Sequence, residues 1–269
     1  MIQHDSRCMR DFSAALAAAL PREPRPVVVN SSLMNLMPPP EFEPRDMLSP
    51  FGELSRRGWT FAFAAFTFQF CRTGLYHARE SKSETGLLAD WVWAARPDAV
   101  RLQNPIYSYV VIGPQAEEFL AACSARTAFG DAGPFGVFER IDALQMGLGC
   151  VAFSQLHRDE QVMGVPYRYM KTFRGKADWC DGRGFSAVDI DMYVRDLEIG
   201  GGPVNQVDSV MDLLKRRGRL LQTPLWRNTV FTVSTRDMAT AAREMLTEDP
   251  FALLTPESAG RVRRHFGPA

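Results

Sequence analysis

The chain has 269 residues, of which 46% are hydrophobic and 23% charged, and its 31 basic and 31 acidic side chains balance to zero formal net charge. This length allows one large domain or two small ones, with a substantial buried core in either case. Balanced charge provides no global field that would attract nucleic acid or an anionic membrane, so neither is expected as a partner. No apolar run approaches the roughly 20 residues that a membrane-spanning helix requires.

The N-terminal segment 12–20 is rich in alanine and follows Arg7 and Arg10. Asp5 and Asp11 interrupt the positive charge that a secretory signal needs, so we expect a helix that ends at Pro21. The five cysteines are odd in number and form no C-x-x-C pair. We expect them to be reduced thiols of a cytoplasmic protein, without disulfides or a zinc site.

Strand and helix patterns alternate from residue 27 onward. The β-branched run 27–29 is typical of a strand that is covered on both faces. Further strands are expected at 60–70, at 107–112, within 141–153 and at 192–195. Helices are expected at 84–95, 116–125, 207–217, 236–246 and 256–266. The segment 37–50, which contains five prolines, is expected to be an irregular loop.

Local signals fix some of these boundaries. Ser83 is the expected N-cap of helix 84–95, and Gly218 is a suitable residue just after helix 207–217. Gly147 and Gly149 indicate positions where another backbone approaches closely. Alternating strands and helices, without repeats or linkers, predict a single α/β domain over residues 1–269, with a mixed or parallel central sheet flanked by helices.

The segment 153–168 holds the most informative polar residues, namely His157, Glu160, Tyr167 and Arg168. A histidine with a pKa of about 6.5 exchanges protons near neutrality. A carboxylate three residues later shares its face if the segment is helical, and can then fix the tautomer of the ring. The sequence therefore predicts acid–base chemistry at His157.

Other catalytic patterns are weak or missing. A second His-x-x-Glu pair, His77 and Glu80, lies in a heavily charged stretch and is interpreted as a solvated loop. A di-iron site would need further glutamates from long helices, so no metal site is expected. Cys150 lies in an apolar run, where a thiol stays protonated and inert. The sequence contains neither a G-x-S-x-G elbow nor a phosphate-binding glycine motif.

Several segments, taken in order, resemble the aminoglycoside N(3)-acetyltransferase family. The family's strand followed by His-Ser-Ser-Leu is similar to residues 27–33, and its Pro-Ser-x-Met-Gly-x-Leu helix start is similar to residues 83–88. Its His-Pro-x-x-Ser-Phe segment resembles residues 104–109. The most recognisable stretch combines His157 and Glu160 with residues 166–168. The resemblance extends from about Val27 to Leu246.

The resemblance implies an antibiotic N-acetyltransferase-like fold and transfer of an acetyl or other acyl group from a CoA thioester to a primary amine. The acceptor would be an amino sugar, an aminoglycoside or a natural-product intermediate, and acetyl-CoA would be a co-substrate rather than a permanent cofactor. His157 would act as general base, oriented by Glu160. The acyl-CoA would be bound by Ser31, Ser32, Leu33, Ser83, Gly86 and Ser108, and the acceptor by Asp159, Tyr167 and Asp181.

Two departures from the family pattern leave alternatives open. Asn30 and Asn104 stand where the family has histidines, so a catalytically inactive homologue that binds CoA or substrate is the alternative function. The zero net charge differs from the acidic character expected for binding polycationic aminoglycosides, which favours a biosynthetic amine as the acceptor. A homodimer and a carrier protein as acyl donor also stay open.

Overall fold

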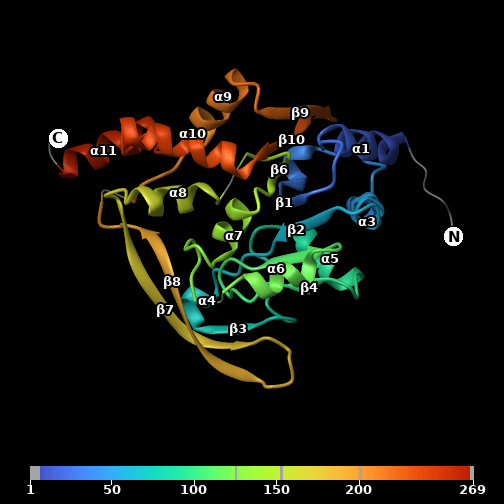
Figure 1. Cartoon of the computed structure of the whole chain (residues 1–269), viewed down its shortest axis with the longest axis horizontal. Coiled ribbons are helices and arrows are strands. Elements are labelled where there is room, and N and C mark those ends of the chain that lie inside the picture. The colour runs from blue at the N-terminus through green and yellow to red at the C-terminus, as the bar shows by residue number, and fades with distance from the viewer. Residues whose placement is uncertain (1–6, 125, 152–153, 200–201, 267–269) are drawn as a thin grey trace.

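The computed structural model describes residues 7–124, 126–151, 154–199 and 202–266 (Figure 1). A central sheet of seven strands crosses the molecule. In chain order these are β1 (Pro26–Ser31), β2 (Thr60–Ala64), β4 (Val100–Arg101), β5 (Tyr109–Ile112), β6 (Leu144–Leu148), β9 (Leu220–Leu225) and β10 (Asn228–Ser234), and their order in space is β4-β5-β2-β1-β6-β10-β9. The three middle strands, β2, β1 and β6, run parallel, and antiparallel strands flank them on both sides. The predicted mixed sheet is confirmed.

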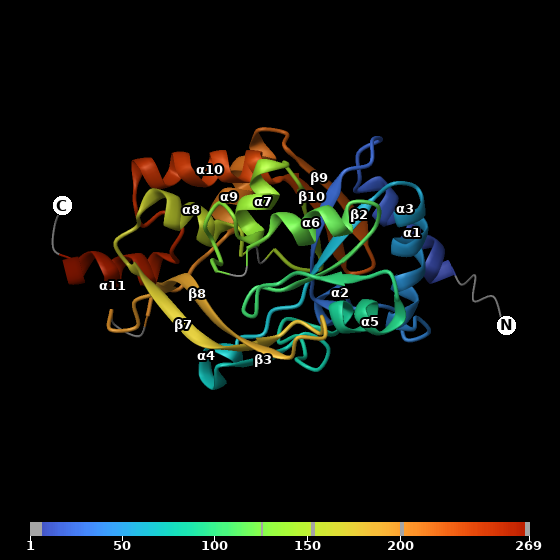
Figure 2. The ribbon, with the colours of Figure 1, turned by 60° about the horizontal axis from the view of Figure 1, so that its bottom comes forward.

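Helices cover both faces of this sheet (Figure 2). The helices of the described chain are α1 (Arg7–Ala18), α2 (Leu33–Leu36), α3 (Leu48–Arg56), α4 (Phe70–Thr73), α5 (Leu87–Ala95), α6 (Ala116–Ala122), α7 (Pro134–Arg140), α8 (Leu156–Met163), α9 (Asp208–Arg216), α10 (Thr235–Glu248) and α11 (Pro256–Phe266), with a short 3₁₀ turn, η1, at Pro44–Met47. Within the described part of the chain, none of them is both long and apolar enough to cross a membrane.

The buried strands explain why there are two hydrophobic cores. Successive side chains of a strand point to opposite faces, so Val27 and Val29 enter one core while Val28 enters the other. The first core packs α1, α3 and α5 against the sheet, and the second packs α7, α9 and α10. A continuous β-branched run therefore fits β1, which is covered on both sides, as its sequence predicts.

A second, smaller sheet forms a long arm of the molecule. It contains β3 (Leu75–His77), β7 (Arg168–Asp178) and β8 (Phe185–Arg195), in the order β3-β7-β8. The antiparallel pair β7–β8 begins beside α8 and extends to β3, as Figure 1 shows. Most side chains of β7 and β8 are exposed or half-buried, and only β8 has the apolar alternation that marks a strand, at Val188, Ile190, Met192 and Val194.

Some predicted boundaries are wrong, for local reasons. The strand expected at 60–70 ends at Ala64, because Phe66 leaves the sheet to pack among aromatic rings, including Tyr107 and Phe135. The helix expected from residue 84 begins at Leu87, and Gly86, at φ 130°, occupies the N-cap position assigned to Ser83. The expected loop 37–50 contains η1 and the start of α3.

Candidate active site

The loop after β6 brings α8 to the carboxyl edge of the parallel strands. Gly149 adopts φ 66°, and a Cβ atom there would lie 2.8 Å from the backbone nitrogen of Leu36 and 2.9 Å from the carbonyl oxygen of Ser32. The nitrogen of Ser32 in turn donates a hydrogen bond to the carbonyl of Leu148, at 2.9 Å. Glycine is therefore required at 149, as the sequence predicts, and the ends of β1 and β6 are held together.

His157 and Glu160 form a hydrogen-bonded pair on α8. Nδ1 of His157 lies 2.7 Å from Oε2 of Glu160. Glu160 is completely buried, whereas the imidazole keeps 24% of its surface exposed. The helical spacing of three residues that the sequence predicts is thus realised as a direct contact.

Three further side chains hold the Glu160 carboxylate in place. Tyr167 donates its hydroxyl to Oε1 at 2.8 Å, and Asn205 donates its amide to the same oxygen at 2.5 Å. Nε of Arg168 lies 2.8 Å from Oε2, and Nη2 of Arg168 donates to Oδ1 of Asn205 at 2.8 Å. Both carboxylate oxygens are therefore engaged, and the charge of Glu160 is balanced by a buried guanidinium.

Two opposing effects act on the His157 ring. Burial, followed by the positive charge of Arg168, whose Nη2 lies 3.0 Å from Nδ1, lowers the pKa of His157 below its ordinary 6.5, although Glu160 favours the charged ring. For Glu160, burial alone would raise the pKa, but the hydrogen bond from His157 and the nearby positive charges lower it. The pair therefore rests as a neutral imidazole beside a carboxylate.

A cavity of about 450 Å³ opens next to His157. Its wall contains, besides the imidazole, residues of the loop before α8 and of the segment 205–208, together with Thr255. Because Nδ1 is engaged by Glu160, Nε2 is the ring nitrogen without a hydrogen bond to any described residue. The arrangement offers a proton acceptor at the edge of a space where a small molecule fits.

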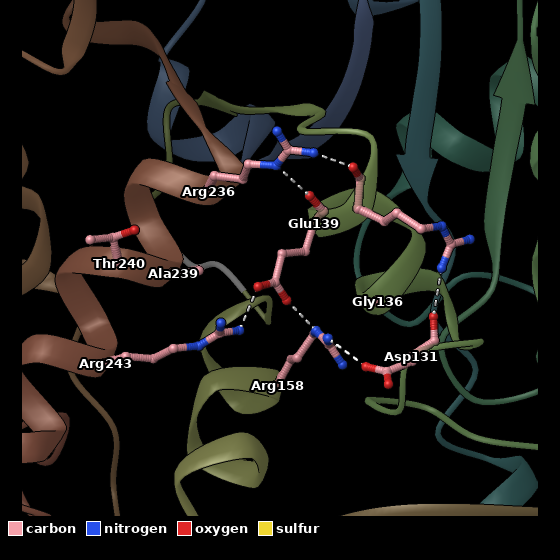
Figure 3. A pocket seen from close by; sticks show the side chains of 9 residues that line it. Asp131, Gly136, Glu139, Arg158, Arg236, Ala239, Thr240 and Arg243 are labelled. Carbon is pink, nitrogen blue, oxygen red and sulfur yellow. Dashed lines mark hydrogen bonds and ion pairs between the residues drawn. The ribbon is translucent and has the colours of Figure 1, made fainter.

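The opposite face of α8 is fixed by ion pairs with neighbouring helices (Figure 3). Arg158 lies 2.5 Å from Glu139 of α7 and 2.8 Å from Asp131. Arg243 of α10 reaches the second oxygen of Glu139 at 2.7 Å and Asp159 at 2.9 Å. Arg158 and Asp159 lie on the face of α8 that points away from His157 and Glu160. Their ion pairs therefore position α8 without touching the imidazole.

The structure separates the three residues predicted to face the acceptor. Asp159 is fully buried against Arg243, and Tyr167 is fully buried with its hydroxyl on Glu160. Asp181 lies in the exposed turn between β7 and β8, paired with Arg183 at 3.3 Å. Neither buried residue can contact a substrate in this structure, and Asp181 lies at the far end of a hairpin whose first residue is Arg168. These three assignments are corrected.

The residues predicted to bind acyl-CoA fall into two groups. Ser31 ends β1, Ser32 caps α2 with its Oγ accepting from the nitrogen of Asn35, and Leu33 is half-buried in the first turn. Ser31 and Gly86 line one narrow cavity, together with Thr85. The part of the chain around these residues therefore forms a single polar edge at the ends of β1 and β2.

Ser83 and Ser108 lie differently. Ser83 accepts a hydrogen bond from the nitrogen of Thr85 at 3.2 Å, in the loop just before Gly86. Ser108 is fully buried, donates to the carbonyl of Leu102 at 3.1 Å and accepts from Nε of Arg101 at 3.2 Å. Its hydroxyl is satisfied inside the protein, so the prediction that Ser108 lines the acyl channel is wrong.

Two residues beside His157 escaped the sequence analysis. Asn205 joins Glu160 to Arg168, and Asp208, the first residue of α9, lines the same cavity as His157. Both are distant from His157 in the chain, and a lone Asn or Asp carries no motif. In the sequence, the only indication of these residues was the short segment 203–206, which precedes the predicted helix 207–217.

A histidine held by a buried carboxylate at the wall of a cavity is an arrangement that acid–base enzymes use. The family model for aminoglycoside 3-N-acetyltransferase matches residues 62–247. The chain therefore belongs to the aminoglycoside 3-N-acetyltransferase family, whose members are acyl-CoA-dependent N-acyltransferases with acetyl-CoA as co-substrate. The resemblance seen in the sequence is confirmed. A search of the curated proteins finds no significant match.

Solved structures with the same fold cover nearly the whole chain. The apoenzyme of aminoglycoside acetyltransferase AAC(3)-IVa is 19% identical, with a TM-score of 0.70 over 95% of this chain and 96% of its own. AAC-IIIb in a binary complex with CoASH is 15% identical, with a TM-score of 0.72 over 89% and 96%. AAC-VIa bound to sisomicin is 15% identical, with a TM-score of 0.72 over 89% and 97%. At these identities the likeness establishes the fold.

Proposed function

We propose that the protein transfers an acetyl or other acyl group from a CoA thioester to a primary amine, with His157 as the general base. The observation that carries this proposal is the pair at 2.7 Å, in which the buried carboxylate of Glu160 engages Nδ1 of His157 beside a cavity of about 450 Å³. A ring fixed in this way keeps Nε2 available to a bound molecule.

The reaction requires a proton acceptor because an alkyl amine with a pKa near 10 is almost wholly protonated at neutral pH. The acceptor ammonium first loses one proton to water, and in the proposed step the neutral amine nitrogen forms a bond to the thioester carbonyl carbon while one of its remaining protons passes to Nε2 of His157. The carbon–sulfur bond then breaks, and the leaving CoA thiolate recovers a proton from the imidazolium. Glu160 stabilises the imidazolium between these two events.

The lowered pKa of His157 suits this role. The ring is mostly neutral at pH 7, so its lone pair is available when the amine arrives. Tyr167 supports the same state, because burial and the adjacent Glu160 raise the pKa of its phenol far above the ordinary range. Its hydroxyl therefore stays a donor to Glu160 at every pH of interest, which keeps the carboxylate oriented toward the ring.

For acyl-CoA, the proposal retains the polar edge at the ends of β1 and β2. Ser31, Ser32, Leu33 and Gly86 are accessible there, and Ser83 lies in the adjoining loop. The N-terminus of α5, where Gly86 makes no side-chain capping bond, favours the phosphate oxygens of CoA. The binary complex of AAC-IIIb with CoASH, which has the same fold, supports a CoA site in this architecture.

The proposed binding region for the acceptor amine is locally acidic, although the chain as a whole has zero net charge. Asp208 lines the cavity of His157 and also a neighbouring cavity of about 560 Å³ between α9 and α10. That second cavity contains the further acidic residues Asp212, Glu244 and Glu248, with Arg216 and Arg217. We therefore assign Asp208 to a second, non-reacting ammonium group of the acceptor, which makes a multiply aminated sugar the favoured substrate class.

The inactive-homologue alternative rested partly on Asn104. This residue is fully buried, donates to the carbonyl of Thr127 at 3.0 Å and accepts from the nitrogens of Ile106 and Tyr107. It stabilises a turn and has no contact with the pair of His157 and Glu160. An asparagine at this position is therefore compatible with catalysis.

Amine-dependent release of free CoA from acetyl-CoA tests the proposal. His157→Ala should lower turnover by about 10²–10⁴-fold, the usual contribution of a positioned general base, while acetyl-CoA binding measured by calorimetry persists. His265→Ala, which changes an exposed histidine of α11, is the matched control and should leave turnover unchanged. Unchanged turnover in His157→Ala would remove His157 from the reaction, and binding of acetyl-CoA without turnover in the wild type would favour the inactive homologue.

A further inference from the structure

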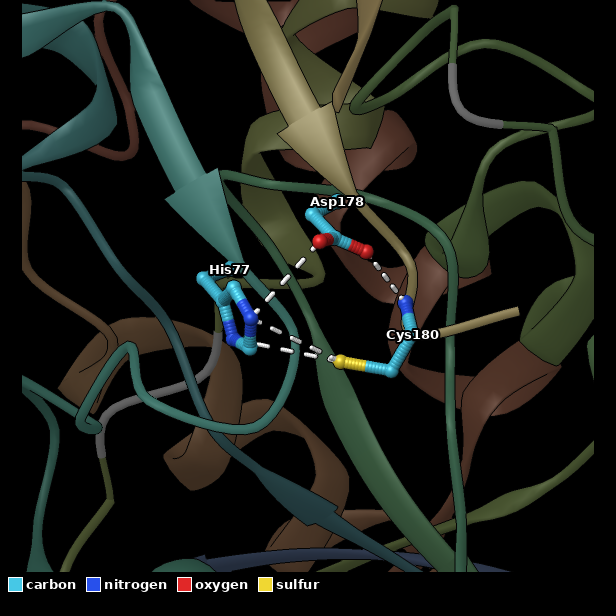
Figure 4. Close-up of side chains that lie close together, drawn as sticks. All are labelled: His77, Asp178 and Cys180. Carbon is cyan, nitrogen blue, oxygen red and sulfur yellow. Dashed lines mark hydrogen bonds and ion pairs between the residues drawn. The ribbon is translucent and has the colours of Figure 1, made fainter. Parts of the chain in front are cut away.

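A second cluster of reactive side chains lies where β3 meets the far end of β7 (Figure 4). His77 is the register partner of Asp178 in the parallel β3–β7 pair, although 101 positions separate them in the sequence. Cys180 follows two residues after Asp178. The imidazole, carboxylate and thiol each offer one atom, and these atoms all lie within 4.8 Å of one another.

The distances in this cluster are too long for strong hydrogen bonds but close to those around a metal ion. Nε2 of His77 lies 3.7 Å from Oδ2 of Asp178 and 3.9 Å from Sγ of Cys180. A tetrahedral zinc ion separates nitrogen and oxygen ligands by about 3.4 Å, and nitrogen and sulfur ligands by about 3.6 Å. Both distances from Nε2 are only about 0.3 Å longer than these. The sulfur also lies 3.8 Å from Nδ1, and the three ligand atoms all lie within 4.8 Å of one another, so a rotation of the side chains of His77 and Cys180 would close the site.

The surrounding backbone leaves one atom of each ligand available. The nitrogen of Cys180 donates to Oδ1 of Asp178 at 2.7 Å, so Oδ2 is the carboxylate oxygen that faces His77. Nδ1 of His77 accepts long hydrogen bonds from the nitrogens of Arg79 and Glu80, at 3.3 and 3.2 Å. Binding an ion at Nε2 moves the ring proton to Nδ1. The nitrogen of Glu80 also donates to the carbonyl of His77, at 3.2 Å, so this N–H keeps a partner when Nδ1 carries the proton, and Arg79 is exposed to water.

We infer that His77, Asp178 and Cys180 form a binding site for a borderline transition-metal ion of the Zn²⁺ type. A thiolate and an imidazole select such an ion, whereas Mg²⁺ and Ca²⁺ prefer oxygen ligands throughout. His77 also lines a cavity of about 410 Å³, together with residues that include Glu80 and Phe185. Three protein ligands leave a fourth, exchangeable position on the ion.

This site is separate from the one at His157. Arg168, which contacts His157, begins β7, and Asp178 ends it, so the 11 residues of the strand place about 33 Å of extended chain between them. The ion would join the β7–β8 turn to β3, and the inference does not depend on the acyltransferase proposal. The His-x-x-Glu spacing at His77 is not what forms the site; the pairing of β3 with β7 forms it.

Cobalt(II) titration of the untagged, chelator-treated protein tests the inference, because Co²⁺ occupies zinc-type sites and reports its ligands by absorption. We expect one Co²⁺ per chain, with a thiolate-to-cobalt charge-transfer band and intense tetrahedral d–d bands, and displacement of cobalt by Zn²⁺. Cys180→Ser should abolish the charge-transfer band. His77→Gln should weaken binding by at least about 10–100-fold, the range already typical for outer partners of metal ligands.

Cys71→Ser is the matched control. Cys71 of α4 is half-buried and lies outside the cluster, so the cobalt spectrum of this variant should equal that of the wild type. Circular dichroism of each variant verifies that the fold persists, as expected for Cys180, whose side chain is exposed. A wild-type protein without a charge-transfer band would overturn the inference, as would a band that survives in Cys180→Ser.

Discussion

Glu160→Gln separates the orientation of His157 from the stability of the fold. In the wild type Glu160 accepts the hydrogen bond from Nδ1 of His157 at 2.7 Å and faces Arg168 at 2.8 Å, with both partners of the ion pair almost completely buried. The glutamine keeps the size of the side chain but removes its charge. The substitution therefore weakens a charge-assisted hydrogen bond and leaves the Arg168 guanidinium without a counter-ion.

The two consequences have different magnitudes. A hydrogen bond to a charged group contributes roughly 1.5–3 kcal/mol, so loss of support for the imidazolium should lower kcat by about 10- to 150-fold. Removing one partner of a buried ion pair costs about 3–5 kcal/mol of stability, because the other charge stays buried. A large loss of unfolding free energy should therefore accompany the kinetic loss.

Two further variants, measured beside Glu160→Gln, make the assay decisive. Steady-state CoA release and urea unfolding are measured for Glu160→Gln, for the double variant Glu160→Gln with Arg168→Met, and for Glu139→Gln. The double variant removes the unpaired guanidinium, so part of the stability should return while kcat stays low. Glu139→Gln breaks ion pairs with Arg158 and Arg243 on the opposite face of α8 and should lower stability without changing the chemistry.

A kcat of Glu160→Gln equal to that of the wild type, under conditions where both are folded, would contradict a role of Glu160 in catalysis. A kcat that recovers together with stability in the double variant would also contradict it, because Glu160 would then act only through the fold.

Three further predictions concern titration and substrate selection. The acid limb of the pH profile of kcat/KM should have its midpoint below pH 6.5, because burial and Arg168 lower the pKa of His157. Arg168→Met should move this midpoint to higher pH. A midpoint above pH 6.5 in the wild type would contradict the lowered pKa. Burial raises the pKa of Asp159 to about 7 from an ordinary 3.8. Between these two pH values the folded protein therefore binds more protons than the unfolded chain. Its unfolding free energy should fall by up to about 4 kcal/mol as the pH rises from 3.8 to 7. Asp159→Asn should abolish this fall in pH-dependent urea unfolding, and an unchanged slope would refute the assignment. Asp208→Asn should raise KM about two- to fivefold for an acceptor with two amines, but not for a monoamine, in parallel steady-state assays.

The sequence indicated those parts of the fold and site that depend on local pattern. The β-branched run of β1 and the spacing of His157 and Glu160 were both visible, because burial on two faces and one helical turn leave a periodic signal. The glycine at 149 was visible because only a residue without a side chain fits so close an approach. These features can be predicted from a few neighbouring residues.

The features that were missed depend on contacts between distant segments. In the sequence, Ser108 cannot be distinguished from a serine that lines a channel. Only the tertiary structure shows that its hydroxyl is hydrogen-bonded to Arg101 and to the carbonyl of Leu102. Asn205 carries no pattern of its own, although it joins Glu160 to Arg168. The strand β7 was missed because most of its side chains are exposed and its apolar residues do not alternate. In β8 the alternation of Val188, Ile190, Met192 and Val194 was present, but only residues 192–195 were recognised as a strand. The pairing that brings Asp178 beside His77 was missed with β7.

Mass spectrometry of a library of amines incubated with acetyl-CoA tests the central claim most directly. With the wild-type protein we expect an N-acetylated product and an equal amount of free CoA, with amino sugars that carry several amines preferred. The same incubation with His157→Ala should yield at most about one hundredth of that product. An equal yield from both proteins would contradict the assignment of His157, and an absence of acetylated amine with bound acetyl-CoA would contradict acyl transfer itself.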